Sequence, residues 1–406
     1  MPAFQAAHMR HARYYTWLMD QVDDRYAAGH QTEALALFDR ERGQFNAAWA
    51  WLVKQSPTSE LDSLLLNFGT ALTYVGDMRY HRQRERIPQL EAFLAAARRQ
   101  GQRDAERSAL NNLANAFADV GDLQQAVVYY QMALDIVRAE GDRDSESVLL
   151  GNLGSLAADQ GNLLEALNYY QEALAISGAV SAWDTVARML GNLGALYADL
   201  GDPQQAISYH ERALEISRIS GDRRMEARSL NNLGTAYADI DDMEHAIEYH
   251  MKALAMSRDM GDRSGETTVL GSLGNDYARL GDMQQAIAYH KQALEISREL
   301  GDRRAEGQDL GNLANALVLA GNITEAVPHY LRQIDIAREI EDSQMYAQAH
   351  WNFGNVLAEF GDIEIAVELM QIGVDFWSEI GHQELPAYQQ RLDEVTRQRD
   401  EGSSSQ

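Results

Sequence analysis

The sequence contains no cysteine, few prolines and no long apolar stretch. Without cysteine the chain can form neither disulfides nor thiolate metal or redox sites. Its 6 prolines among 406 residues leave most of the chain able to be helical. No segment approaches the roughly 20 apolar residues that a membrane-spanning helix needs, and residues 1–5 do not begin a secretory signal. These absences predict a soluble, cytoplasmic, helical protein.

Basic residues are scarcer than acidic ones, and the imbalance is confined to one part of the chain. The formal net charge is -26. Residues 1–103 hold 13 basic and 11 acidic residues, whereas residues 104–406 hold 22 basic and 50 acidic ones. Negative charge of this size repels nucleic-acid phosphates and anionic membranes and attracts basic groups. We therefore expect no nucleic-acid or membrane binding, and a protein or peptide partner that can carry basic segments.

A short turn recurs at intervals of 40 residues. A second turn falls midway, and each half-unit carries apolar residues at helical spacing, as in Leu190, Leu193, Gly194 and Tyr197. A period of this length is typical of a solenoid of helix pairs. The first residues of the recurring turn are Gly121, Gly161, Gly201, Asp241, Gly281, Gly321 and Gly361.

The turn residues also predict where the helices end and begin. Gly201 is expected to end a first helix in the left-handed conformation, and Asp202 to cap the second helix. Asn162, Asp282 and Asn322 are predicted to repeat that capping.

The repeated pattern Leu-x2-Leu-Gly-x2-Tyr-x8-Ala resembles the tetratricopeptide repeat, with a period of 40 instead of about 34 residues. The resemblance implies an all-α, right-handed superhelical solenoid of antiparallel helix pairs. Such long repeats resemble those of kinesin light chains and Pins-type adaptors, and segments such as 232–237 and 300–303 are similar to the latter. Those families bind extended peptides in a concave groove, which implies a binding function here.

The pattern divides the chain into four parts. Residues 1–60 form an N-terminal region of two helices that meet near Gly29, with Pro57 after the second. Residues 61–103 are a degenerate repeat whose second helix is expected to be longer than the others and to expose a basic face with Arg79, Arg82, Arg84 and Arg86. Residues 104–383 hold seven repeats, and residues 384–406 a polar capping helix over 388–399 and a disordered tail from Gly402.

The segments 10–15 and 46–52 carry a second resemblance. They are similar to the link between the nucleotide-binding region and the tetratricopeptide sensor of bacterial NB-ARC-type signalling ATPases of the STAND class. This resemblance implies that the chain is a sensor module. No phosphate-binding Gly-x4-Gly-Lys-Ser/Thr loop is present, so we expect no ATP binding through that motif.

Asparagine recurs at one position of the first helices, and these residues are called the asparagine ladder: Asn112, Asn152, Asn192, Asn232, Asn312 and Asn352. Ser272 interrupts the ladder. An amide both donates and accepts, so the ladder can bind the backbone of an extended peptide. Alternatively, the amides bind neighbouring repeats and fix the pitch of the solenoid. One turn further on, the same helix face carries Asn115, Asn275, Asn315 and Asn355.

Charged residues flank the ladder on this face. Arg188 and Arg228 precede it by one turn and suit a ligand carboxylate. Four aspartates, called the acidic row, follow it and suit basic side chains: Asp119, Asp159, Asp199 and Asp239. A ligand that is acidic in one part and basic in another would match both groups.

No pattern indicates catalysis, a metal or a cofactor. His210, His250 and His290 recur at intervals of 40 residues. Equivalent atoms of adjacent repeats lie about 10 Å apart, which is too far for one metal ion. Because other repeats have tyrosine at this position, we expect these histidines to be packing residues. No nucleophile stands beside a base. The sequence predicts a non-enzymatic protein- or peptide-binding scaffold, with a self-assembling architectural scaffold or an accessory subunit of an enzyme as alternatives.

Overall fold

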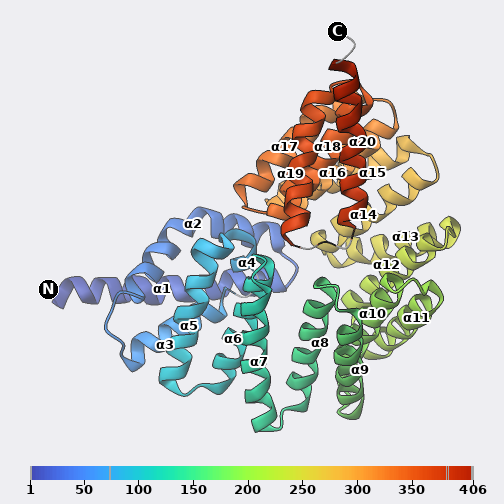
Figure 1. The fold of residues 1–406 in the computed structure, drawn as a ribbon. Coiled ribbons are helices and arrows are strands. Elements are labelled where there is room, and N and C mark those ends of the chain that lie inside the picture. The colour runs from blue at the N-terminus through green and yellow to red at the C-terminus, as the bar shows by residue number, and fades with distance from the viewer. Residues whose placement is uncertain (1, 73–74, 381, 383, 404–406) are drawn as a thin grey trace. The chain divides into compact units, whose positions relative to one another are not determined.

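A computed structural model describes residues 2–72, 75–380, 382 and 384–403 (Figure 1). All regular elements within these residues are helices. They form two compact units, residues 1–263 and 264–406. None of the helices in the described parts of the chain is long and apolar enough to cross a membrane.

Residues 103–379 form seven consecutive helix pairs, as the period predicts. The first helices are α6 (Arg103–Asp119), α8 (Arg143–Asp159), α10 (Trp183–Asp199), α12 (Arg223–Asp239), α14 (Arg263–Arg279), α16 (Arg303–Leu319) and α18 (Ser343–Glu359). The second helices are α7 (Leu123–Glu140), α9 (Leu163–Ala179), α11 (Pro203–Ser220), α13 (Met243–Met260), α15 (Met283–Leu300), α17 (Ile323–Glu339) and α19 (Ile363–Glu379).

Small residues let the two helices of a repeat approach closely. A Cβ atom added at Gly154 would lie only 2.7 Å from the Tyr170 ring, so only glycine fits beneath this ring. On the second helix, Ala206 and its counterparts at 40-residue intervals are fully buried. The recurring glycine and alanine thus set the distance between the paired helices.

The predicted helix ends are confirmed in part. Gly201 is left-handed with φ 78°, and the Asp202 carboxylate accepts from the Gln205 N–H at 3.1 Å. Asp282 caps α15 in the same way. The prediction was wrong at Asn162 and Asn322, whose side chains make no capping hydrogen bond.

The N-terminal region consists of α1 (Pro2–Ala27) and α2 (Gln31–Leu52), which separate at Gly29 as predicted. The degenerate repeat begins with α3 (Ser59–Thr70). Its second half was predicted as one long helix, and this was wrong: it comprises α4 (Val75–Arg79), the π-helix η1 (Arg82–Arg86) and α5 (Ile87–Gln100). Pro88 stands in the first turn of α5, where its missing N–H favours a helix start over a helix interior.

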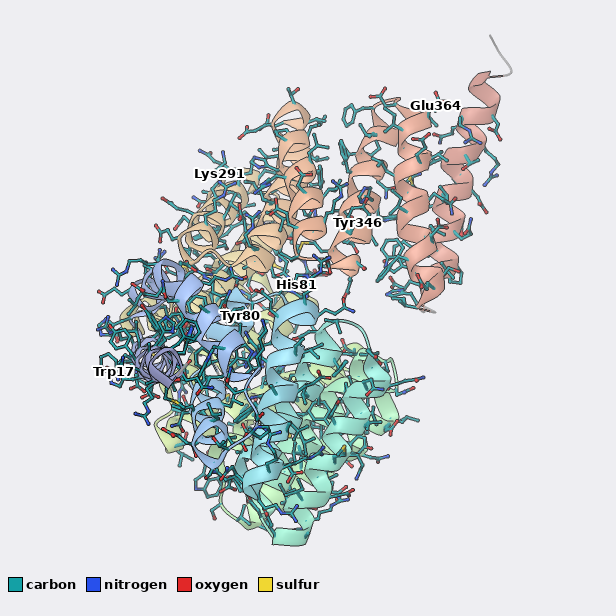
Figure 2. All side chains as sticks on the ribbon, turned by 90° about the vertical axis from the view of Figure 1, so that its left-hand side faces the viewer. Trp17, Tyr80, His81, Lys291, Tyr346 and Glu364 are labelled. Atoms are coloured by element: carbon teal, nitrogen blue, oxygen red, sulfur yellow. The ribbon has the colours of Figure 1, made fainter. Side chains whose placement is uncertain are left out.

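The predicted exposed basic face of this repeat is found at Arg84 but not at Arg79 or Arg86, and the side chain of Arg82 lies outside the described residues. The Arg79 guanidinium pairs with the Asp39 carboxylate at 2.9 Å, and Arg86 is fully buried. Tyr80, labelled in Figure 2, lies between α4 and η1 and donates to the Asn46 amide oxygen at 2.7 Å. These contacts attach the repeat to the N-terminal helices.

The C-terminal helix α20 (Leu385–Ser403) is longer than predicted and includes Gly402, which was expected to be disordered. Residues 404–406 of the predicted tail lie outside the described residues. The Tyr388 ring stacks on Trp377 at 3.9 Å between centroids, and Leu392 and Val395 are buried beside it. The helix therefore covers the apolar end of the last repeat.

Candidate ligand-binding face of the first helices

The face that carries the predicted site belongs to the first helices. Within the first unit, α8 contacts α10 and α10 contacts α12, and within the second unit α16 contacts α18. Among the described residues, no pair of consecutive second helices has comparable contacts. Each array therefore bends locally toward its first helices, and the asparagine ladder lies on these inner helices.

Every residue of the asparagine ladder is half-buried. Asn152 donates to the side-chain oxygen of Asn111 in the preceding repeat at 2.8 Å, as the packing alternative predicts. Asn352 accepts from Gln348 of its own helix at 2.8 Å. Asn112, Asn192, Asn232 and Asn312 make no side-chain hydrogen bond with any described residue.

Three of the four amides one turn further on are engaged within the fold. The Tyr130 hydroxyl donates to Asn115, and the Tyr330 hydroxyl donates to Asn315 at 2.5 Å. Asn355 accepts from Arg391 of α20 at 3.1 Å. For these three residues the contacts favour the packing role, whereas Asn275 has no such partner among the described residues.

Arg188 and Arg228 lie in α10 and α12 without a carboxylate partner at salt-bridge distance among the described residues. Arg188 is half-buried, and the only hydrogen bond that it makes to a described residue is a weak one to the Asn152 oxygen at 3.5 Å. Burial lowers the pKa of the Arg188 guanidinium, and repulsion from Arg228 lowers it further, although Asp144 partly opposes the change. The two guanidinium groups thus form a cationic site that the fold does not neutralise.

The acidic row is exposed at the other end of these helices. Burial raises the pKa of Asp159, and the charge of Asp119 raises it further. Asp199 has a raised pKa for the same reason, with Asp239 as the neighbouring charge. The aspartates of successive repeats therefore repel one another, and a cation between them would relieve that repulsion.

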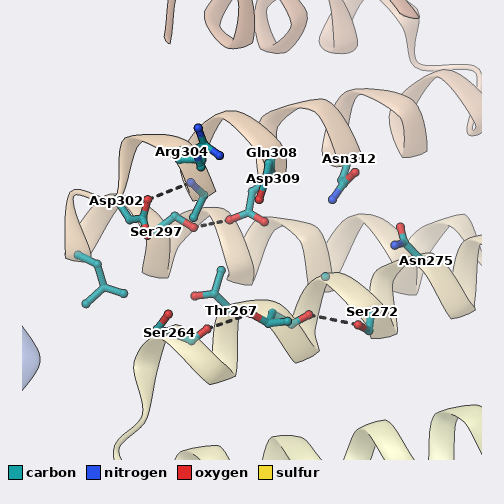
Figure 3. Close-up of a pocket in the computed structure, with 14 residues that line it drawn as sticks. Ser264, Thr267, Ser272, Asn275, Ser297, Asp302, Arg304, Gln308, Asp309 and Asn312 are labelled. Carbon is teal, nitrogen blue, oxygen red and sulfur yellow. Dashed lines mark hydrogen bonds between the residues drawn. The ribbon is translucent and has the colours of Figure 1, made fainter. Parts of the chain in front are cut away.

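The second unit has a different feature on the same face, a polar pocket of about 380 Å³ between α14, α15 and α16 (Figure 3). The predicted site residues Asn275 and Asn312 line it, but its buried carboxylate, Asp309, was not predicted. The sequence does mark Asp309, because no other repeat has a charged residue at the equivalent position. Those residues are Ala109, Leu149, Met189, Ser229, Val269 and Ala349.

The histidines are packing residues, as predicted. His210, His250 and His290 are all buried at the position that tyrosine occupies in other repeats. Burial lowers the pKa of His210 and of His290 to about 4. Within the described residues, no group of three or more His, Asp or Glu side chains is arranged to hold a metal ion.

Comparison with known proteins identifies the repeat. The tetratricopeptide repeat family matches residues 105–178, 185–259, 265–327 and 309–371, well over half of the chain. The chain belongs to the tetratricopeptide repeat family. A search of curated protein sequences gives no significant match.

Solved structures show the same fold at low sequence identity. A STAND protein with a tetratricopeptide repeat sensor from Pyrococcus horikoshii has a TM-score of 0.50 and 18% identity, over 87% of this chain and 55% of that one. A Rap protein complexed with competence and sporulation factor has a TM-score of 0.50 and 16% identity, over 96% and 99%. Aspartyl phosphate phosphatase F from Bacillus subtilis has a TM-score of 0.51 and 14% identity, over 94% of each chain.

Proposed function

We propose that this tetratricopeptide repeat protein is a non-enzymatic sensor or adaptor that captures an extended peptide segment on its first helices. In the first unit the ligand lies across α10 and α12. A carboxylate of the ligand binds Arg188 and Arg228, and its backbone binds the amides of Asn192 and Asn232. Basic ligand side chains lie toward the acidic row.

The observation that carries the proposal is the unneutralised arginine pair. Several other arginines of this array are paired with carboxylates, as Arg218 is with Glu226 at 2.8 Å and Arg138 with Glu146 at 2.8 Å. Arg188 is half-buried, and the exposed Arg228 repels it electrostatically. An anionic ligand group between the two guanidinium groups removes that cost.

The neighbouring amides supply the second requirement. Asn192 and Asn232 have no side-chain partner among the described residues, so their donors and acceptors are available to a peptide backbone. The structural neighbours support this function because a Rap protein of this fold is complexed with competence and sporulation factor, and a STAND protein uses such repeats as a sensor.

The test is selection from a random library of 12-residue peptides, acetylated and amidated at their ends, on the immobilised full chain. We expect enrichment of Asp or Glu, and Arg188→Ala with Arg228→Ala should reduce that enrichment at least tenfold. Arg212→Ala is the matched control, because this arginine lies on α11 over the Tyr209 ring and not on the first helices. Retention of no peptide by the wild type, or equal enrichment with the double variant, would overturn the proposal.

A further inference from the structure

The pocket of the second unit is built where the repeat pattern changes. Ser272 stands on α14 where the other six repeats have the asparagine ladder, so this wall loses one side-chain amide, and Gly271 beside it has no side chain. The opposite wall is α16, with Gln308 and Asn312 (Figure 3). Serine in place of asparagine thus opens space on this face of the first helices.

Asp309 forms the floor of this space. Its side chain is 5% exposed, and one carboxylate oxygen accepts from the Ser297 hydroxyl of α15. The other oxygen has no hydrogen-bond partner among the described residues. A buried carboxylate at a position that other repeats fill with small or apolar residues costs stability unless a partner compensates it.

The other charged groups do not supply that partner. The charged residues that line the pocket are Asp302, Arg304 and Asp309, whereas α14 and α15 contribute only uncharged lining residues. Asp302 accepts from the Ala305 N–H at 3.0 Å and caps α16. Arg304 pairs with Asp342 at 3.1 Å. The pocket therefore has a net negative lining.

The uncharged lining adds acceptors around the floor. Asn275, Gln308 and Asn312 each present an amide that has no side-chain hydrogen bond with a described residue. Several separated acceptors around one carboxylate match the planar group of five N–H donors of a guanidinium better than the compact ammonium of lysine.

We propose that this pocket binds the guanidinium of an arginine side chain of a peptide bound to the second unit, with the Asp309 carboxylate as its counter-ion. The inference rests on the proposed peptide-binding function and names a specificity-determining site for it. Asn275, Gln308 and Asn312 accept the remaining N–H groups.

The titration of Asp309 gives the site a pH signature. Burial raises the pKa of Asp309 to about 7, and the charge of Asp302 raises it while the Ser297 bond opposes the rise. A guanidinium binds the ionised form of Asp309. Molecules in which Asp309 is protonated must therefore release that proton when the ligand binds. The affinity for arginine peptides should fall about tenfold between pH 8 and pH 6.

The experiment uses the same 12-residue library on the full chain at pH 8. We expect arginine to be enriched at one position of the retained peptides, and Asp309→Asn to reduce this enrichment at least fivefold. Asp309→Leu restores an apolar residue, as in Leu149, and should lose the same enrichment while remaining folded. Glu295→Gln removes one exposed carboxylate from α15 outside the pocket and should change nothing.

The outcomes separate this inference from the proposed function. Retained peptides that show no arginine preference, a preference for lysine over arginine, or an arginine preference that survives in Asp309→Asn would each overturn the pocket assignment alone. Retention of no peptide by the wild type would overturn both. Thermal unfolding of each variant establishes that it is folded before selection.

Discussion

The α10–α12 face of the first unit and the α14–α16 face of the second use one 40-residue pattern to present opposite charges. The first face carries Arg188 and Arg228 beside intact asparagines, whereas the second carries Ser272 in place of asparagine and a buried Asp309. Packing of the paired helices is retained in both, through glycine beneath an aromatic ring. Residues of the first helices can therefore change the charge that this face presents without altering the repeat that supports them.

The largest expected effect comes from erasing the difference in the second unit. Ser272→Asn restores the ladder residue and narrows the pocket, and Asp309→Val replaces the carboxylate with the residue at 269. We expect the arginine preference of the library to fall more than tenfold, because both the counter-ion and the space are lost. The acidic preference that depends on Arg188 and Arg228 should persist. Joint loss of both preferences in a folded variant would contradict independent sites.

Asp309 should also make stability depend on pH. Burial raises its pKa in the fold to about 7, against an ordinary value of 3.8. The protonated side chain therefore stabilises the fold at low pH, and this stabilisation is lost as pH rises from about 4 through 7. Asp309→Leu should therefore raise the free energy of unfolding by of order 2 kcal/mol at pH 8 and by less at pH 4. Urea unfolding at both pH values measures this, and an equal gain at both would refute the raised pKa.

A smaller effect is expected from exchanging buried histidines for tyrosine. Tyr330 donates to Asn315 at 2.5 Å, so His290→Tyr should donate to Asn275, the equivalent residue, and gain about 1 kcal/mol. His210→Tyr faces Ala195 at that position and should gain less. Thermal unfolding at pH 8 compares the two variants, and a larger gain at 210 than at 290 would show that the hydrogen bond is not the cause.

The same exchange tests acid sensitivity. Burial lowers the pKa of His210 and His290 to about 4, below the ordinary value of 6.5. Their neutral forms stabilise the fold above pH 6.5, and that stability is lost as pH falls toward 4. Each tyrosine variant should lose less stability than the wild type between pH 7 and pH 5, measured by urea unfolding. Identical losses would contradict the assignment.

The smallest effect concerns the caps that failed. Asn322 makes no capping bond, whereas the Asp282 carboxylate accepts from the Gln285 N–H at 3.1 Å. Asn322→Asp should stabilise α17 by roughly 0.5 kcal/mol. Thermal unfolding of the variant beside Glu295→Gln, a surface control, checks it; a lower midpoint for Asn322→Asp would count against the capping argument.

The repeats could be predicted from the sequence because their signals are local. Glycine at position 201 and leucine at helical spacing determine helix ends and buried faces within a few residues. The interruption at residues 80–81 and the π-helix η1 do not follow from the repeat pattern. Pro88 is the local signal, because it lacks the N–H that a continuous α-helix would need there. Asp309 was not predicted, because a periodic pattern identifies residues that recur at one repeat position, whereas Asp309 occurs in one repeat only.

Whether the asparagines one turn beyond the ladder are hydrogen-bonded depends on the residue that the second helix places beside them. Asn115 and Asn315 accept from tyrosine, but the equivalent second-helix position is histidine beside Asn275. Asparagine at the same repeat position therefore has a hydrogen-bond partner in some repeats and none among the described residues in others. The neighbouring helix determined it, and that requires the structure.

Charge reversal on the first helices tests the central claim most directly. Arg188→Glu with Arg228→Glu replaces the cationic site by an anionic one on the same helices. In selection from the 12-residue library, we predict that the enrichment of Asp and Glu disappears and that Lys and Arg become enriched in its place. An unchanged acidic preference in the folded variant would contradict the claim that these residues of the first helices select the ligand.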